Sequence, residues 1–178
     1  MSELVGRGAI ELAEMVRRHE VKPTEVVEAH LRQVEALEPR LHAFLALRAE
    51  RAMDEARELE KRPDLAELPL AGVPTAMKDS VDVAGEPTRL GSLATSDAPA
   101  EADDELTTRV RHAGAIVIGK TRQPELAIFH NTDSRFGTTR NPWNLERAPG
   151  GSSGGAGAAV ASAMIPLAQA SDGGGIMA

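Results

Sequence analysis

The sequence has 178 residues, a length that fits one domain or a piece of one. Its net charge of −7, with no Lys/Arg-rich block, argues against a nucleic-acid partner, because proteins that bind phosphate backbones usually present a basic face. The chain has no cysteine, which excludes disulfides, thiol catalysis and cysteine-ligated metals. It shows no secretory leader and no apolar run of about 18 residues, so we expect a cytoplasmic protein that does not enter the membrane.

The N-terminal third predicts helices. Residues 8–18 place their apolar side chains on one helical face. Thr24 is a candidate N-cap for a second helix, which Pro39 is expected to end. Residues 42–47 form a short apolar run that fits either a strand or the start of a helix. Residues 50–61 are rich in Ala and charge and predict an exposed third helix.

After the loop at residues 63–69 the pattern changes. Strand-like and helical segments alternate, with strands predicted at 70–83, 115–118 and 166–170 and helices at 103–113 and 154–164. In the helix at 103–113, Leu106, Val110 and Ala113 are expected to face inward. This alternation predicts an α/β protein with a mixed β-sheet flanked by helices. We therefore divide the chain into an N-terminal helical segment, 1–62, and the start of an α/β core, 63–178.

The segment Pro149–Gly157 places paired serines, Ser152 and Ser153, between paired glycines. Glycine lets a ligand approach the main chain closely, and two hydroxyls at a helix entry can donate, accept or relay protons. A flexible Gly/Ser linker is the alternative. The Ala-rich packing sequence that follows favours a structured segment.

Lys78 closes a mostly apolar strand in the segment Pro69–Asp79. Desolvation at such a place lowers the pKa of a lysine and lets it act as a neutral base. The alternative is a solvated lysine that forms a salt bridge with Asp79. Since most lysines are solvated, Lys78 taken alone favours that alternative.

Ser171 and Asp172 precede three glycines, Gly173, Gly174 and Gly175. Successive backbone N–H groups in a glycine turn can converge on one point and hold a developing oxyanion. A plain tight turn fits the same residues equally well.

Two other patterns give weak signals. Residues 114–121 fit G-x-x-x-x-G-K-[ST] literally, but the interval Ala-Ile-Val-Ile predicts a buried strand where a phosphate loop needs a flexible backbone. His130 and Asp133 are two potential ligands without a third, so a surface loop is favoured over a metal site. We therefore expect neither a nucleotide nor a metal.

Taken together, these segments resemble the amidase-signature family. The resemblance rests on Pro-Leu-x-Gly-Val-Pro-x-x-x-Lys-Asp ending at Asp79, Gly-Gly-Ser-Ser-Gly-Gly beginning at Gly150, and Asp-Gly-Gly-Gly from Asp172. Residues 114–121 and 139–144 also look familial, and the motifs occur in the family's order across nearly the whole chain.

The resemblance implies an amidase that cleaves a carbon–nitrogen bond of a small-molecule amide by acyl transfer through a Ser–cis-Ser–Lys triad. Lys78 then matches the base and Ser152 the bridging serine. The oxyanion-hole turn corresponds to Gly173, Gly174 and Gly175, with Ser153, Ser171 and Asp172 in support. The family's chemistry implies no cofactor and no metal.

The match breaks at the residue after Gly175. The family has its nucleophilic serine there, and this sequence has Ile176. Family members are also much longer, so we expect a truncated sequence with an incomplete sheet, prone to self-association or homo-oligomer formation. The 178 residues alone are expected to show no amidase turnover.

Two other hypotheses stay open. The chain fits a non-catalytic remnant or interaction module in which the site residues are inherited but unused. It also fits a fragment of the amidase subunit of a tRNA-dependent amidotransferase.

Overall fold

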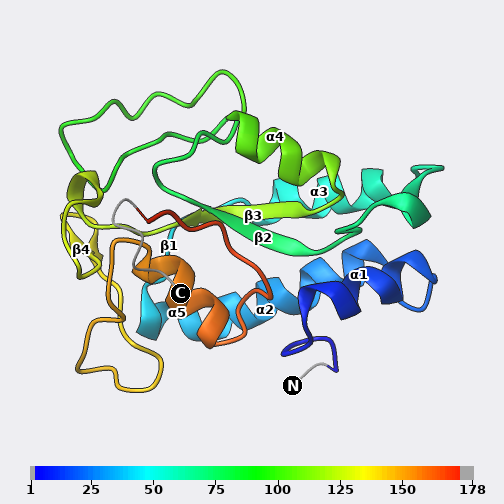
Figure 1. The fold of residues 1–178 in the computed structure, drawn as a ribbon, viewed down its shortest axis with the longest axis horizontal. Helices are drawn as coiled ribbons and strands as arrows, with labels where there is room; N and C mark the ends of the chain where they lie inside the picture. Colours follow the sequence, from blue (N-terminus) through cyan, green and yellow to red (C-terminus); the bar gives the residue numbers. More distant parts are fainter. Residues whose placement is uncertain (1–2, 173–178) are drawn as a thin grey trace.

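The computed structural model describes residues 3–172 and centres on a three-stranded mixed sheet (Figure 1). Its strands are β1 (Phe44–Leu47), β2 (Pro74–Lys78) and β3 (Ile116–Thr121), in the order β1-β3-β2. β3 pairs antiparallel with β1 and parallel with β2. Every residue of β2 and β3 is buried, as expected for strands covered on both faces. The predicted α/β class with a mixed sheet is confirmed.

Five helices within residues 3–172 surround the sheet. They are α1 (Ala9–Arg17), α2 (Pro23–Leu41), α3 (Ala49–Glu60), α4 (Glu105–His112) and α5 (Gly154–Ala161). In the view of Figure 1, α2 and α5 lie below the sheet and α4 lies above it. Short 3₁₀ turns at Leu65–Glu67 and Glu125–Ala127 and a two-strand hairpin, β4 (Asp133–Ser134) with β5 (Gly137–Thr138), complete the named elements.

The predicted ends of the second helix need correction. Its N-cap is Lys22, whose backbone N–H donates to Glu25 Oε2 at 2.8 Å, so Thr24 already lies inside the helix. Pro39 does not end α2, which continues to Leu41. Glu38 accepts hydrogen bonds from the backbone N–H groups of Ala43 (2.9 Å) and Phe44 (3.2 Å). The backbone donors just beyond the helix are therefore paired.

The predicted inward face of α4 is wrong at Leu106, which is 39% exposed. Asp104 caps the helix by accepting from Leu106 N–H at 2.8 Å, and this places Leu106 in the first turn on the outside. Thr107 is buried instead, because its hydroxyl donates to the Asp82 carbonyl at 2.7 Å.

The strand predicted at 166–170 is also wrong, because the structure has no strand there. The segment, drawn in red in Figure 1, runs beside β2 and is joined to it by the Gln169 N–H, which donates to the Ala76 carbonyl at 2.9 Å. Pro166 has no N–H to give to a ladder. The segment therefore borders the sheet without extending it, and it carries Ser171 to the end of β2.

The main hydrophobic core runs through both predicted segments of the chain. β1 belongs to the N-terminal segment, yet it pairs with β3. The core combines residues from both sides of the predicted boundary at residue 62, among them Leu12, Val16, Val26, Val34, Ile118, Met164 and Ile165. The boundary itself stays a prediction.

Candidate active site at the carboxyl end of β2

Lys78 is the last residue of β2, and its side chain is fully buried. Its ammonium nitrogen reaches two hydroxyls: Nζ donates to Ser152 Oγ at 2.7 Å and to Ser171 Oγ at 2.8 Å. The strand therefore delivers the lysine to the edge of the sheet where α/β proteins place their chemistry. Solvation, the alternative considered for Lys78 from sequence, is wrong.

Burial lowers the pKa of Lys78, and the nearby charge of Asp172 offsets part of this effect. Desolvation disfavours the ammonium form, whereas the two hydroxyl oxygens that accept from Nζ favour it. The lowered pKa makes Lys78 easier to deprotonate than a solvated lysine. Once neutral, a lysine can accept a proton.

Ser152 and Ser153 follow one another but face different partners. The Gly151–Ser152 peptide bond is cis, and the Ser152 hydroxyl lies against Lys78. Ser153 is buried, and its Oγ donates to the Ser171 carbonyl (3.1 Å) while accepting from the Ser171 N–H (3.2 Å). This two-way contact fixes the backbone of residue 171 and so positions the second hydroxyl next to Lys78.

The serines reach this point because α5 packs very closely on the sheet. A Cβ at Gly155 would lie 2.5 Å from the Arg122 carbonyl oxygen and 2.6 Å from that of Ala43. Only glycine permits such an approach of two backbones. Gly151, Gly154 and Gly155 are thus packing residues at and before the start of a helix, and the flexible-linker interpretation is wrong.

A second lysine, Lys120 of β3, is also fully buried. Its Nζ pairs with Asp79 Oδ1 at 3.4 Å and donates to the Pro87 carbonyl (2.9 Å) and to Thr88 Oγ1 (2.6 Å). Burial lowers the pKa of Lys120, and the carboxylate of Asp79 counters this most strongly. Sequence reasoning missed this pair, because it considered Asp79 only as a partner of Lys78.

Gln169 is a further residue that the sequence did not single out. Its Oε1 accepts from the backbone N–H of Lys78 at 3.0 Å, which ties the 166–171 segment to the last residue of β2. The sequence feature that could have identified Gln169 is its position as the one polar side chain in an otherwise apolar stretch, two residues before Ser171.

The structure thus brings together Lys78, Ser152, Ser153 and Ser171, with Asp172 close enough to act on Lys78 by charge. Gly173, Gly174 and Gly175, predicted to form the oxyanion hole, lie outside the described residues. The catalytic role of each residue stays a prediction.

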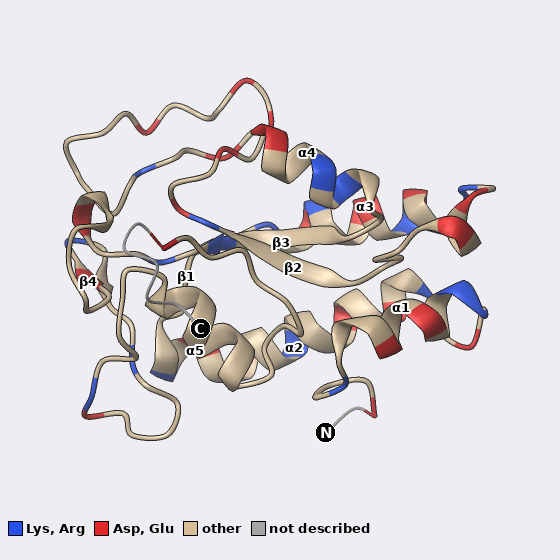
Figure 2. Cartoon of the chain, in the orientation of Figure 1, with Lys and Arg blue, Asp and Glu red and all other residues tan. Residues whose placement is uncertain are grey.

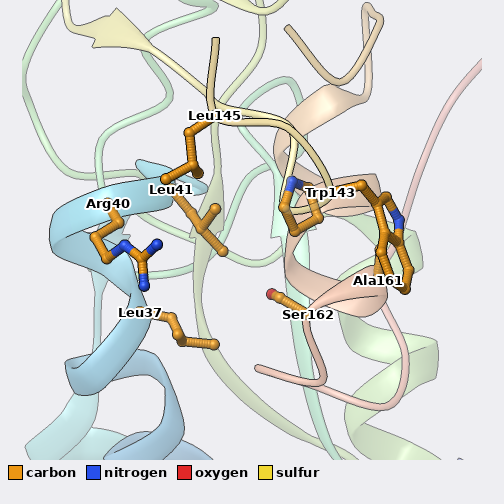
Figure 3. Close-up of a pocket in the computed structure, with 8 residues that line it drawn as sticks. Leu37, Arg40, Leu41, Trp143, Leu145, Ala161 and Ser162 are labelled. Atoms are coloured by element: carbon orange, nitrogen blue, oxygen red, sulfur yellow. The ribbon is translucent and has the colours of Figure 1, made fainter. Parts of the chain in front are cut away.

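Trp143 lies in a different place. It is 83% exposed and, with Leu37, Leu41 and Leu145 among others, lines a pocket of about 230 Å³ at the C-terminal ends of α2 and α5 (Figure 3). None of the predicted site residues within 3–172 lines this pocket. The tryptophan therefore neither borders the lysine–serine cluster nor packs in the core.

Within residues 3–172 no helix is long and apolar enough to cross a membrane. In the same part of the chain, no three His, Asp or Glu side chains gather as a metal ion would require. In α4 the acidic residue lies in the first turn and the basic residues lie in the last, α3 carries both charges, and α5 carries none (Figure 2).

Comparison with known proteins agrees with this picture. The family model described as "Amidase" matches residues 25–176. A putative amidase, AmiB2 of Mycobacterium tuberculosis, is 46% identical over 176 residues, which is 98% of this chain and 38% of that protein. One of the subunits of the glutamyl-tRNA(Gln) amidotransferase of Acidothermus cellulolyticus is 44% identical over 178 residues, covering 98% of this chain and 35% of that protein.

Among solved structures, a bacterial aryl acylamidase described as an amidase-signature enzyme superposes with a TM-score of 0.84 at 33% identity. The match covers 94% of this chain and 36% of that one. The chain therefore spans little more than a third of the length of the relatives it matches.

Proposed function

The chain belongs to the amidase-signature family, and from that premise we propose that it is the N-terminal part of a cytoplasmic amidase that hydrolyses the carboxamide bond of a small molecule. One observation carries the proposal. A fully buried lysine, whose pKa is lowered by burial, donates a hydrogen bond to a serine hydroxyl 2.7 Å away. Such a pair suits proton transfer between the amine and the hydroxyl.

In the proposed reaction the neutral amine of Lys78 takes a proton from Ser152, which takes one from the nucleophile as that group attacks the amide carbonyl. Gly173, Gly174 and Gly175, whose part in the oxyanion hole is predicted from the sequence, are expected to hold the oxyanion. The proton then returns to the leaving ammonia or amine, and water cleaves the acyl-enzyme. Ser153 contributes by fixing residue 171, so that Lys78 keeps its second hydroxyl partner.

The nucleophile of this scheme is not supplied by residue 176, which is isoleucine. The proposed activity is therefore that of the protein from which the sequence derives. Purified residues 1–178 are expected to leave simple amides intact.

The test begins with the intact mass of the protein from its native source. A mass well above 18.8 kDa calls for a panel of simple aliphatic and aromatic amides, with ammonia or amine release as the readout. Lys78→Ala and Ser152→Ala in that longer protein are each expected to lower kcat/KM by about 10²-fold or more, as is typical for loss of a general base. Full activity in both variants would refute the roles assigned here.

A second candidate is the amidase subunit of a tRNA-dependent amidotransferase, which the 44% identity to the glutamyl-tRNA(Gln) amidotransferase protein favours. The amidase and the amidotransferase subunit can be distinguished by whether the protein needs partner subunits. An amidase acts alone, whereas such a subunit works within a complex and copurifies with other subunits. A native mass near 18.8 kDa with no amide turnover would favour instead a non-catalytic remnant.

A further inference from the structure

Lys78 contacts two hydroxyls and can activate only one of them at a time. A neutral amine has one lone pair and two N–H bonds, so it can accept a proton from one serine while donating to the other. Both Ser152 and Ser171 lie within hydrogen-bond reach, at 2.7 and 2.8 Å. The described chain therefore contains a lysine–serine pair that needs no third residue to generate a nucleophile.

The surroundings favour Ser152 as the activated hydroxyl. Ser171 is exposed, so water competes with Lys78 for its hydroxyl, whereas Ser152 is half-buried next to a fully buried amine. An alkoxide held away from water is the more reactive nucleophile. Ser152 also lies just before the N-terminus of α5 (Gly154–Ala161), where the helix dipole stabilises negative charge. Because Ser152 is only half-buried, a reagent can still reach its hydroxyl.

From this geometry we infer that Ser152 is itself a covalent modification site, at which an activated acyl or phosphonyl group is accepted directly. This differs from the bridging role proposed above and does not require the residues that complete an amidase. It applies to electrophiles with a leaving group that departs without protonation. A carboxamide fails this condition, because its nitrogen must be protonated before it leaves.

The step balances with a fluorophosphonate as the electrophile. Ser152 Oγ attacks phosphorus and forms an O–P bond, while the P–F bond breaks and fluoride leaves with the electron pair. The proton of the hydroxyl passes to Lys78 Nζ, which becomes an ammonium. No oxidation or reduction occurs, and the phosphonyl group stays on the serine.

The experiment treats the 178-residue chain with a fluorophosphonate at neutral pH and locates the adduct by mass spectrometry of its peptides. We expect one adduct, on Ser152, absent in Ser152→Ala and formed at least about 10²-fold more slowly in Lys78→Met. Ser96→Ala is the matched control. Ser96 is an exposed serine whose hydroxyl accepts from the backbone N–H of Ala98 rather than from a lysine, so its loss leaves labelling unchanged.

The same reaction in urea gives the rate of an unactivated serine in the unfolded chain. A rate at Ser152 equal to that reference, no adduct, or an adduct on Ser171 or another serine overturns the inference. An unchanged rate in folded Lys78→Met overturns it too. The urea reference decides the matter even where Lys78→Met does not fold. Amide hydrolysis by the longer protein is a separate readout, so each proposal can fail alone.

Discussion

The carboxylate of Asp79 pairs with Lys120 on the neighbouring strand, 3.4 Å away, although Lys78 precedes it directly in the chain. Asp79 Oδ1 and Oδ2 also accept from the backbone N–H groups of Arg89 (3.1 Å) and Gly91 (2.9 Å). Both partners of the pair are fully buried. Two lysines thus lie at adjacent strand ends, one with a carboxylate partner and one held by hydroxyls, and they should respond oppositely to the same substitution.

Lys120→Met should destabilise the protein strongly. It leaves the buried Asp79 anion without its cation, and breaking one partner of a buried ion pair typically costs about 3–5 kcal/mol. Urea unfolding followed by circular dichroism measures the loss. The double variant Asp79→Asn with Lys120→Met should recover part of it, because no unpaired charge is then buried. A single variant as stable as the parent would contradict this account of the pair.

Lys78→Met should stabilise the fold while removing the proposed base. The side chains have similar length, the desolvation that lowers the pKa of Lys78 disappears, and Ser152 and Ser171 retain access to water. We expect a gain of about 1 kcal/mol in the same unfolding experiment, as is common when a functional polar group is removed. A loss of unfolding free energy comparable to that of Lys120→Met would mean that Lys78 stabilises the folded structure.

Buried His30 should make stability fall in mild acid. Its Nδ1 lies 3.2 Å from the Met164 carbonyl oxygen, its Nε2 has no partner within residues 3–172, and burial lowers its pKa from 6.5. The folded state therefore binds a proton less readily than the unfolded chain. The contribution of His30 to the free energy of unfolding is fully present above pH 6.5. It is lost as the pH falls from 6.5 through the folded-state pKa.

Unfolding free energies at pH 8, 6.5 and 5 test this with His30→Gln, which carries no titrating ring. The loss between pH 8 and 5 should be smaller in His30→Gln than in the parent. The exposed His130, replaced in His130→Gln, serves as the control, and its profile should follow the parent. Parallel profiles for the parent and His30→Gln would disprove the assignment to His30.

Two glycines of α5 offer a matched pair for the packing argument. Gly155→Ala places a methyl 2.5 Å from the Arg122 carbonyl oxygen and should cost about 1–3 kcal/mol by overpacking. Gly157, two residues later, has nothing within 4 Å of an added Cβ, so Gly157→Ala should gain about 0.5–1 kcal/mol from helix propensity. Thermal unfolding of the two variants measures both, and equal effects would show that α5 is not pressed onto the sheet.

Local chemistry could be predicted from the sequence because it depends on neighbours in the chain. The buried run predicted at 115–118, which the structure extends as Ile116–Thr121, the strand that ends at Lys78 and the helix that follows the paired serines were each expected from a few adjacent residues. Helix ends were less predictable. The termination expected at Pro39 and the inward position expected for Leu106 were wrong. Glu38 accepts from the backbone of Ala43 beyond the helix, and Asp104 caps α4 at the N–H of Leu106.

The sequence by itself determined which groups were available: one lysine at a strand end, a glycine-flanked pair of serines, and a serine followed by an aspartate. Only the tertiary structure decided which of them meet. Lys78 and Ser152 are separated by 74 positions, and they touch because the register of β2 against β3 and the glycine contacts of α5 bring them together. Burial, a property of the packed molecule, makes Lys78 a candidate base. The packing also decides that Asp79 forms its ion pair with Lys120.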